Sequence, residues 1–469
     1  MSERAIDLPL PRGRFAGFFL ALVAALAIGL LCVVHPIAAI ALVALPIVGA
    51  LALRDASALV GATLFLHMVG ERQGFSYASV GFAGFHLFPN DLLTVTLLVV
   101  VVLRALREGR ALALPRDPID WALWAFLLYG VFSMVRGLGL HGWASILSFR
   151  LQFSYAVLFL LVRDCLREKR SRANLGKVIL AAGVVVGLQG IWNAVTGTAV
   201  GAATSTGTYR YLSGLQALTL VFALAVLFGG VWPTRRPAWS VALAGLYLVG
   251  ILLAQARSVW LGAILGVTTV AFAGSELRRH GAKLLIAMLV GIGVLLLALP
   301  RLASLPVVGD VYSRLTSFQD LDRDATSLWR LVVWTSALLE LRSDPILGLG
   351  LGKQFSYWDV VRGEWDKESQ MHNSYLELAY YTGAVGVGLL ILFQTLVLIA
   401  TLRAARAAAG TPRSARLKAL AAVQVCFYAV AFTNVIGASM TSATFGWILA
   451  AWSMSESLSA ERLGNRHRN

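Results

Sequence analysis

The sequence has 469 residues, of which 58% are apolar and only 14% charged, and its formal net charge is +16. Soluble domains carry about 25% charged residues, so this composition excludes an ordinary soluble protein. The apolar residues form continuous runs of about 18–25 residues, the length that crosses a bilayer. A β-barrel needs alternating segments of about 10 residues instead. We therefore expect an all-α fold, a polytopic transmembrane helix bundle.

The predicted membrane spans follow one another along the chain. We expect them at residues 15–34, 36–53, 56–70, 91–104, 119–135, 143–162, 174–195, 211–231, 239–255, 258–274, 283–300, 375–402, 418–435 and 440–457. The second and third runs are short and joined only by Arg54 and Asp55, so we expect about 12–14 spans. The first run lacks a small-residue cleavage site, so we interpret it as a retained span.

Basic residues are concentrated in the connectors between these runs. Clusters occur at Arg4–Arg14, Arg104–Arg116, Arg163–Arg172, Arg235–Arg236, Arg278–Lys283, Arg403–Lys418 and Arg462–Arg468. All of them fall on one side of the predicted spans. Cytoplasmic connectors carry such an excess of Lys and Arg, so we assign this side and both termini to the cytoplasm. Orientation in the membrane thus explains the positive charge, and nucleic-acid binding is not expected.

The opposite, periplasmic side carries a large polar loop, residues 301–374. Its segment "SLWRLVVWTSALLELR" (327–342) has the pattern of an amphipathic helix, and "DPILGLGLGKQF" (344–355) predicts turns because it is rich in proline and glycine. We divide the chain into transmembrane helices with short loops (1–300), this loop (301–374), and further transmembrane helices with a cytoplasmic tail (375–469).

His372 stands where this polar loop ends, in "QMHNSYLELAYYTGAVGVGLL" (370–390). Ser374 and Glu377 fit a capping box, so a helix is expected to start there. The positive end of a helix disfavours imidazolium, and a neutral imidazole can act as a general base. The alternative is an interfacial histidine that is hydrogen-bonded to water.

Several arginines lie on the same periplasmic side. Arg257 falls between two apolar segments and is a candidate anion site, because a guanidinium pairs with phosphate oxygens; Gln255 and Ser258 flank it. Arg330 lies on the predicted amphipathic helix, with Trp334 one turn further on. For Arg257 the alternative is a snorkelling side chain, and for Arg330 a solvated one. Weaker candidates are Arg150, a few residues inside a span, and Arg210, at a loop end.

Motifs of other chemistries are missing from the sequence. It contains no phosphate-binding G-x-x-x-x-G-K-[ST], no H-E-x-x-H and no G-x-S-x-G. Asp320, Asp322 and Asp324 alternate, but Arg323 intervenes, so we do not expect a metal site there. Cys32, Cys165 and Cys426 have no spacing of a disulfide or metal framework. Arginines and one histidine at a helix start suit an anionic, lipid-linked substrate and a hydroxyl that must lose its proton.

Four segments together resemble the O-antigen ligase superfamily. "HNSYLELAYYTGAVG" (372–386) is similar to its H-N-x-Y-L…G…G signature, and the others are "AQARSVWLG" (254–262), "WRLVVW" (329–334) and "DPILGLGLGKQF" (344–355). The order also corresponds: an arginine between two spans, an arginine in the large loop, then the histidine. The motifs cover residues 205–400.

The resemblance implies a GT-C-like, metal-independent glycosyltransferase without a cofactor, in the bacterial inner membrane. It implies that Arg257 and Arg330, with the looser matches Arg150 and Arg210, bind the pyrophosphate of an undecaprenyl pyrophosphate-linked glycan. His372 would be the base on the acceptor hydroxyl of lipid A–core, in an inverting transfer. We expect Gln255, Trp334, Asn373, Tyr375 and Glu377 to support the site, and a monomer surrounded by membrane lipids. The alternatives are a polysaccharide polymerase with the same donor and a polytopic lipid or glycan transporter.

Overall fold

The computed structural model describes residues 55–70, 80–82, 85–109, 115, 117–198, 210–229, 237–272, 309, 325–359, 363–368, 371–434 and 440–466. The predicted spans at 15–34, 36–53 and 283–300 lie outside the described residues. So do Asp320, Asp322 and Asp324, and Cys32.

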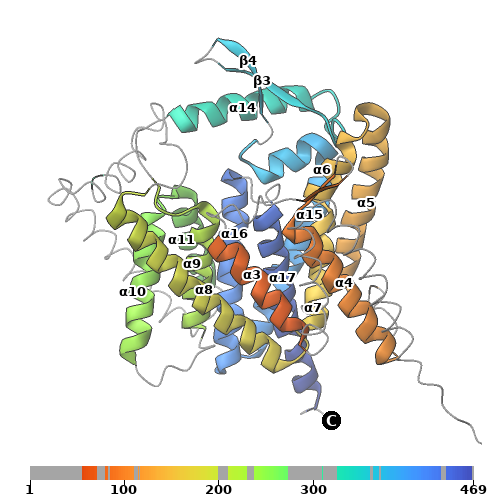
Figure 1. The fold of residues 1–469 in the computed structure, drawn as a ribbon. Coiled ribbons are helices and arrows are strands. Elements are labelled where there is room, and N and C mark those ends of the chain that lie inside the picture. Colours follow the sequence, from red (N-terminus) through yellow and green to blue (C-terminus); the bar gives the residue numbers. More distant parts are fainter. Residues whose placement is uncertain are drawn as a thin grey trace, which may run out of the picture.

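A bundle of antiparallel helices makes up most of the described chain (Figure 1). It consists of α3 (Ala56–Gly70), α4 (Pro89–Arg107), α5 (Pro118–His141), α6 (Ala144–Gln152), α7 (Val157–Cys165), α8 (Lys169–Thr196), α9 (Gly214–Phe228), α10 (Pro237–Leu253), α11 (Arg257–Phe272), α15 (Ser374–Ala407), α16 (Pro412–Thr433) and α17 (Met440–Arg466). The short 3₁₀ turn Ser154–Ala156 joins α6 to α7. Every span predicted within the described residues coincides with helix, so the prediction of an all-α bundle is confirmed.

Several of these helices are suited to a membrane. Five segments are long and apolar enough to cross one: Pro118–His141, Ala144–Cys165, Lys169–Thr196, Ser374–Ala407 and Pro412–Thr433. Shorter apolar helices, such as α3 and α9, pack among them. Large apolar side chains remain exposed on the bundle, among them Leu128 and Val195. This is what hydrocarbon contact favours in place of water.

One end of the bundle, which we call the loop end, is covered by α14 (Ala325–Leu341) and a hairpin of β3 (Phe355–Asp359) and β4 (Glu364–Glu368). α14 confirms the amphipathic helix expected at 327–342. The hairpin was not predicted, and neither was a smaller one formed by β1 (Val80–Phe82) and β2 (Phe85–Leu87). The chain ends at the opposite, C-terminal end of the bundle (Figure 1).

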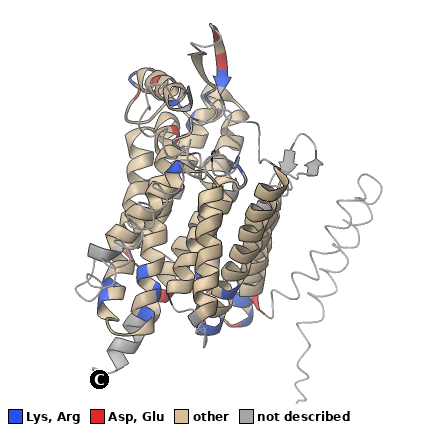
Figure 2. Cartoon of the chain, turned by 90° about the vertical axis from the view of Figure 1, so that its left-hand side faces the viewer, with Lys and Arg blue, Asp and Glu red and all other residues tan. Residues whose placement is uncertain are grey.

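Basic residues gather at the C-terminal end, whereas the middle of the bundle is almost free of charge (Figure 2). Arg163 lies 2.6 Å from an oxygen of Asp120, and Arg172 lies 2.6 Å from an oxygen of Glu456. Arg416 binds the other oxygen of Glu456 at 2.8 Å. The basic connectors that can be compared therefore share one end, as their spacing predicts.

α15 is kinked at Gly383, and this kink joins the loop end to the bundle. The glycine has φ of 65°, and a Cβ there would come within 2.1 Å of the Ile346 carbonyl oxygen. The amides of Leu349 and Gly350 donate to the carbonyls of Tyr380 and Tyr381, just before the kink. The predicted turns of 344–355 are confirmed, and they fill the space that the kink leaves.

A small apolar cluster fixes α14 above the start of α15. Val333 and Ala337 of α14 are fully buried against Phe355 and Tyr357 of β3, Tyr380 of α15, and Met371, which lies just before α15. On the other side of α14, Leu331 and Leu338 are more than half exposed. The helix is thus amphipathic with its inner face turned toward the residues just before α15, which include His372.

Candidate functional site

His372 lies in a strained turn immediately before α15. Its φ is 51°, a left-handed value that non-glycine residues seldom adopt and that is common at functional sites. Asn373 is the N-cap: its side-chain oxygen accepts from the amides of Tyr375 and Leu376, at 3.2 and 3.0 Å. The predicted capping box was therefore wrong by one residue, because asparagine is an equally good cap. The prediction that a helix starts here is confirmed.

Two tryptophans of α14 hold this turn. The indole N–H of Trp334 donates to the Met371 carbonyl at 2.9 Å. The ring of Trp329 contacts the imidazole edge-on, with ring centroids 5.2 Å apart, and its N–H donates to the Tyr357 hydroxyl at 2.7 Å. The imidazole is therefore positioned by α14 and β3 from above and by α15 from below.

Asn434, at the C-terminal end of α16, connects the start of α11 to the start of α15. Its side-chain amide donates to the Ser258 hydroxyl at 2.6 Å. Its carbonyl accepts from the Ser374 hydroxyl at 2.8 Å. Ser258 follows Arg257 in the first turn of α11, and Ser374 follows the His372–Asn373 turn. The bridge thus brings the arginine of one helix start close to the histidine of another.

Arg210 is held at the same end by its neighbour Tyr211. The Tyr211 amide donates to the Leu253 carbonyl at the end of α10. The Tyr211 carbonyl accepts from the side chain of Asn193, near the end of α8, at 2.8 Å. Leu253 lies four residues before Arg257, so the two arginines enter the site from adjoining segments.

The electrostatics connect these residues into one cluster. Burial lowers the pKa of Arg210, and the charges of Arg330 and Arg257 lower it further. Burial also lowers the pKa of His372 to about 4, again with contributions from Arg330 and Arg210. We call Arg210, Arg257, Arg330 and His372 the arginine–histidine cluster. Positive charges that lower the pKa of a buried neighbour mark a place where an anion would be stabilised.

The histidine is neutral near pH 7 for a reason that differs from the sequence argument. We expected the positive end of α15 to disfavour imidazolium, whereas burial is the larger cause and the two arginines follow it. A neutral imidazole among permanent positive charges can accept a proton once an anion offsets those charges.

Gln255 is the second strained residue of the site. Its φ is 48°, and among the described non-glycine residues it shares a positive φ with His372 alone. Its side chain is completely buried, and neither its amide nitrogen nor its amide oxygen has a hydrogen-bond partner. Buried amides are nearly always satisfied, so an unsatisfied one two residues from Arg257 suits a group that awaits a ligand.

Arg150 is placed differently from the arginine–histidine cluster. It forms a bidentate ion pair with Asp91, at the start of α4, and stacks over the Phe88 ring at 4.9 Å. Tyr155 also donates to Asp91, at 3.0 Å. The carboxylate neutralises this guanidinium, so the structure does not bring Arg150 together with the other three arginines. Its role in binding pyrophosphate stays a prediction.

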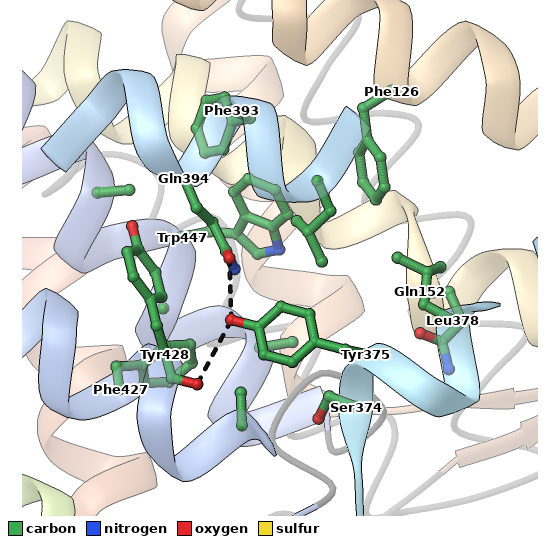
Figure 3. Close-up of a pocket in the computed structure, with 15 residues that line it drawn as sticks. Phe126, Gln152, Ser374, Tyr375, Leu378, Phe393, Gln394, Phe427, Tyr428 and Trp447 are labelled. Carbon is green, nitrogen blue, oxygen red and sulfur yellow. Dashed lines mark hydrogen bonds between the residues drawn. The ribbon is translucent and has the colours of Figure 1, made fainter. Parts of the chain in front are cut away.

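Tyr375 and Glu377 point into the bundle beneath the cluster. The Tyr375 hydroxyl crosses an apolar cavity of about 60 Å³ to donate to Gln394 at 2.9 Å, and the Tyr428 carbonyl lies 3.4 Å away (Figure 3). A carboxylate oxygen of Glu377 accepts from Gln152 of α6 at 3.0 Å. Ligand pockets measure about 300–1,000 Å³, so this cavity adjoins the site without being large enough to hold a sugar.

Sequence reasoning missed Asn434, Trp329 and Tyr357. Asn434 lies more than 60 residues from His372 and shares no motif with it, and only the packing of α16 against α11 and α15 reveals it. Trp329 stands beside Arg330 in the quoted segment "WRLVVW", so an aromatic next to a candidate arginine was the available signal. Tyr357 had none, because its strand was not predicted.

A comparison with protein families gives a match over part of this chain. Residues 242–393 match the family described as O-antigen ligase. The matched region contains Gln255, Arg257, Arg330 and His372, whereas Arg150, Arg210 and Asn434 lie outside it. A comparison with curated proteins gives no match.

Proposed function

Residues 242–393 match the O-antigen ligase family, and we propose that the chain is a member of this superfamily and transfers a glycan from undecaprenyl pyrophosphate to a hydroxyl of lipid A–core. Its apolar helices and its family make it an integral membrane protein with ligase- or polymerase-type activity on lipid-linked glycans. The observation that carries the finer proposal is the arginine–histidine cluster, in which Arg330 and Arg210 act on a neutral imidazole and Arg257 acts on Arg210.

The three arginines bind the pyrophosphate of the donor. Negative charge grows on the leaving phosphate as its bond to the sugar breaks, and donors fixed in advance stabilise that charge without reorganisation. Guanidiniums suit this task because they stay protonated and grip phosphate oxygens with two N–H groups at once. The charges of Arg257 and Arg330 lower the pKa of Arg210, and a bound diphosphate would offset this repulsion.

His372 accepts the proton of the acceptor hydroxyl. The oxygen attacks the anomeric carbon from the face opposite the pyrophosphate, the bond from that carbon to the phosphate oxygen breaks, and the undecaprenyl pyrophosphate leaves. One displacement inverts the anomeric configuration. The low pKa of the free histidine rises when the anion offsets the arginines, which brings the base closer to the proton affinity that catalysis near neutral pH requires.

The gathering of basic residues at the C-terminal end supports the orientation of the protein (Figure 2). By the positive-inside rule this end faces the cytoplasm, so the loop end and the cluster face the periplasm of the inner membrane. We assign 301–374 to the catalytic loop, with helices on both sides of it as the membrane part.

A complementation experiment tests the proposal. A strain that lacks the gene receives wild type or one variant, Arg257→Ala, Arg330→Ala or His372→Ala, and its lipopolysaccharide is separated on gels. We expect each variant to be made in normal amount but to leave the glycan unattached to core. Arg342→Ala is the matched control, because this arginine is exposed just after α14.

The same gels distinguish a ligase from a polymerase. A strain without a ligase retains long polymer on its lipid carrier, whereas a strain without a polymerase carries single repeat units on core. Undiminished attachment in the His372→Ala strain would contradict the catalytic assignment itself.

A further inference from the structure

The β3–β4 hairpin has one buried face and one exposed aromatic face. Phe355 and Tyr357 of β3 are each 2% exposed and point toward α14. Trp358 alternates with them and is 45% exposed, and its partner across the strands, Trp365, is 70% exposed. The two indoles contact each other edge-on at 5.9 Å. Among the described residues this cross-strand pair belongs to neither hydrophobic cluster, so burial against them does not account for it.

Hydrocarbon does not account for the pair either. Contact with hydrocarbon does account for exposed tryptophans on the bundle: Trp121 is 63% exposed on α5, within a segment long and apolar enough to span a membrane. The hairpin lies outside the bundle, beyond α14 (Figure 1). Lys367 is exposed on the same face of β4 as Trp365, and Glu364 is exposed on the other face. Charged groups this close to the aromatic pair oppose insertion of the hairpin into lipid.

The hairpin is continuous with the arginine–histidine cluster. Tyr357, next to Trp358 in β3, accepts a hydrogen bond from Trp329, and the Trp329 ring rests on His372. Two side-chain contacts thus lead from the buried face of the hairpin to His372. A polymer attached there and running outward from the bundle passes the hairpin.

We propose that Trp358 and Trp365 form a saccharide-binding platform for the glycan of the substrate, outside the reaction site. This inference rests on the proposed function, because it takes a glycan to be the substrate. The faces of aromatic rings carry negative electrostatic potential, which attracts the C–H groups on the apolar face of a pyranose ring. Indoles set at an angle offer faces to more than one sugar, while the ammonium of Lys367, on the same face of the hairpin, donates hydrogen bonds to hydroxyls.

Binding to the full-length protein in nanodiscs tests the platform. The probes are O-polysaccharide and core oligosaccharide, each released by mild acid from the bacterium's own lipopolysaccharide, and binding is measured by saturation-transfer NMR titration. We expect Trp358→Ala and Trp365→Ala to weaken binding of one probe about tenfold, as expected when an aromatic anchor is lost. The probe that responds identifies the donor or the acceptor glycan as the ligand. Trp358→Tyr should restore most of the affinity, and Trp121→Phe should leave it unchanged.

Equal affinities in wild type and in both alanine variants would overturn the proposal, provided that the variants have the same melting temperature as the wild type. So would quenching of the hairpin indoles by brominated lipids, which would make the pair a membrane contact. The titration is repeated in the His372→Ala background, where turnover is lost and the platform is intact. If the His372→Ala protein still binds the sugar and the added Trp365→Ala substitution removes that binding, the platform is supported independently of the catalytic assignment. Failure of the platform and failure of the catalytic assignment are thereby distinguished.

Discussion

His372 combines a left-handed backbone, an edge-on indole and two nearby guanidiniums, and its acid–base behaviour follows from them. Because burial and the arginines lower its pKa to about 4, the free enzyme keeps a neutral base well below the ordinary value of 6.5. We therefore expect the acid limb of the kcat/KM profile, which reports the free enzyme, to lie near pH 4–5. The limb of kcat should lie at higher pH, because bound pyrophosphate offsets the arginines. Coincident limbs near pH 6.5 would contradict this account.

Substitution of Gln255 by an apolar residue is expected to raise the stability of the protein and to weaken its activity. Its buried amide lacks partners, and an unsatisfied buried group costs about 1–3 kcal/mol. Gln255→Met keeps the shape and removes the unsatisfied atoms, so we expect a higher melting temperature together with weaker donor binding. Thermal unfolding and KM for the donor provide the measurements.

Gln216 is the matched control for this substitution. It is also fully buried, but its oxygen accepts from the Ser213 amide and its nitrogen donates to Gln189. Gln216→Met should therefore lower the melting temperature. If Gln255→Met lowers it as well and leaves KM unchanged, Gln255 has a structural role only.

At the scale of single elements, the kink of α15 decides where the turns of 344–352 can lie. Gly383→Ala places a Cβ against the Ile346 carbonyl and forces a non-glycine residue to φ of 65°, which costs at least about 1–3 kcal/mol. We expect a lower melting temperature and loss of glycan transfer. Gly388→Ala, in the same helix with open space around it, should have little effect or a small stabilising one. Equal effects of the two substitutions would show that the kink is not required.

The hydrogen bond from Asn434, at the end of α16, to Ser258 of α11 leads to a second prediction at the scale of single elements. Asn434→Ala removes only the side-chain bond to Ser258, since the backbone carbonyl that binds Ser374 remains. We expect kcat/KM to fall about tenfold, through misplacement of Arg257. Ser258→Ala should have a similar effect, and the double variant should be no worse than either one, because both remove the same bond. If the losses in kcat/KM of the two single variants add in the double variant, Asn434 and Ser258 act independently and not through their shared hydrogen bond.

Across the whole molecule, the elements were predictable and their convergence was not. The apolar runs, the helix start near His372 and the amphipathic α14 follow from periodicity and capping residues. The hairpin was missed because "FSYWD" is a five-residue alternation inside a polar loop, too short to be distinguished from turns. Arg210 and Arg330 come near enough to act on His372 because Asn434, Trp334 and the kink at Gly383 join distant segments, and such contacts depend on packing. Arg150, a weaker candidate a few residues inside a predicted span, pairs with Asp91, which only the position of α4 reveals.

The central claim is a division of labour: arginines bind the lipid pyrophosphate and His372 removes the acceptor proton. The most direct test measures undecaprenyl pyrophosphate binding and single-turnover glycan transfer on the same full-length variants in nanodiscs. We expect Arg257→Ala and Arg330→Ala to weaken binding at least about tenfold. His372→Ala should bind as the wild type does and transfer at least about a hundredfold more slowly. Transfer at the wild-type rate by His372→Ala, or wild-type binding by both arginine variants, would contradict the account.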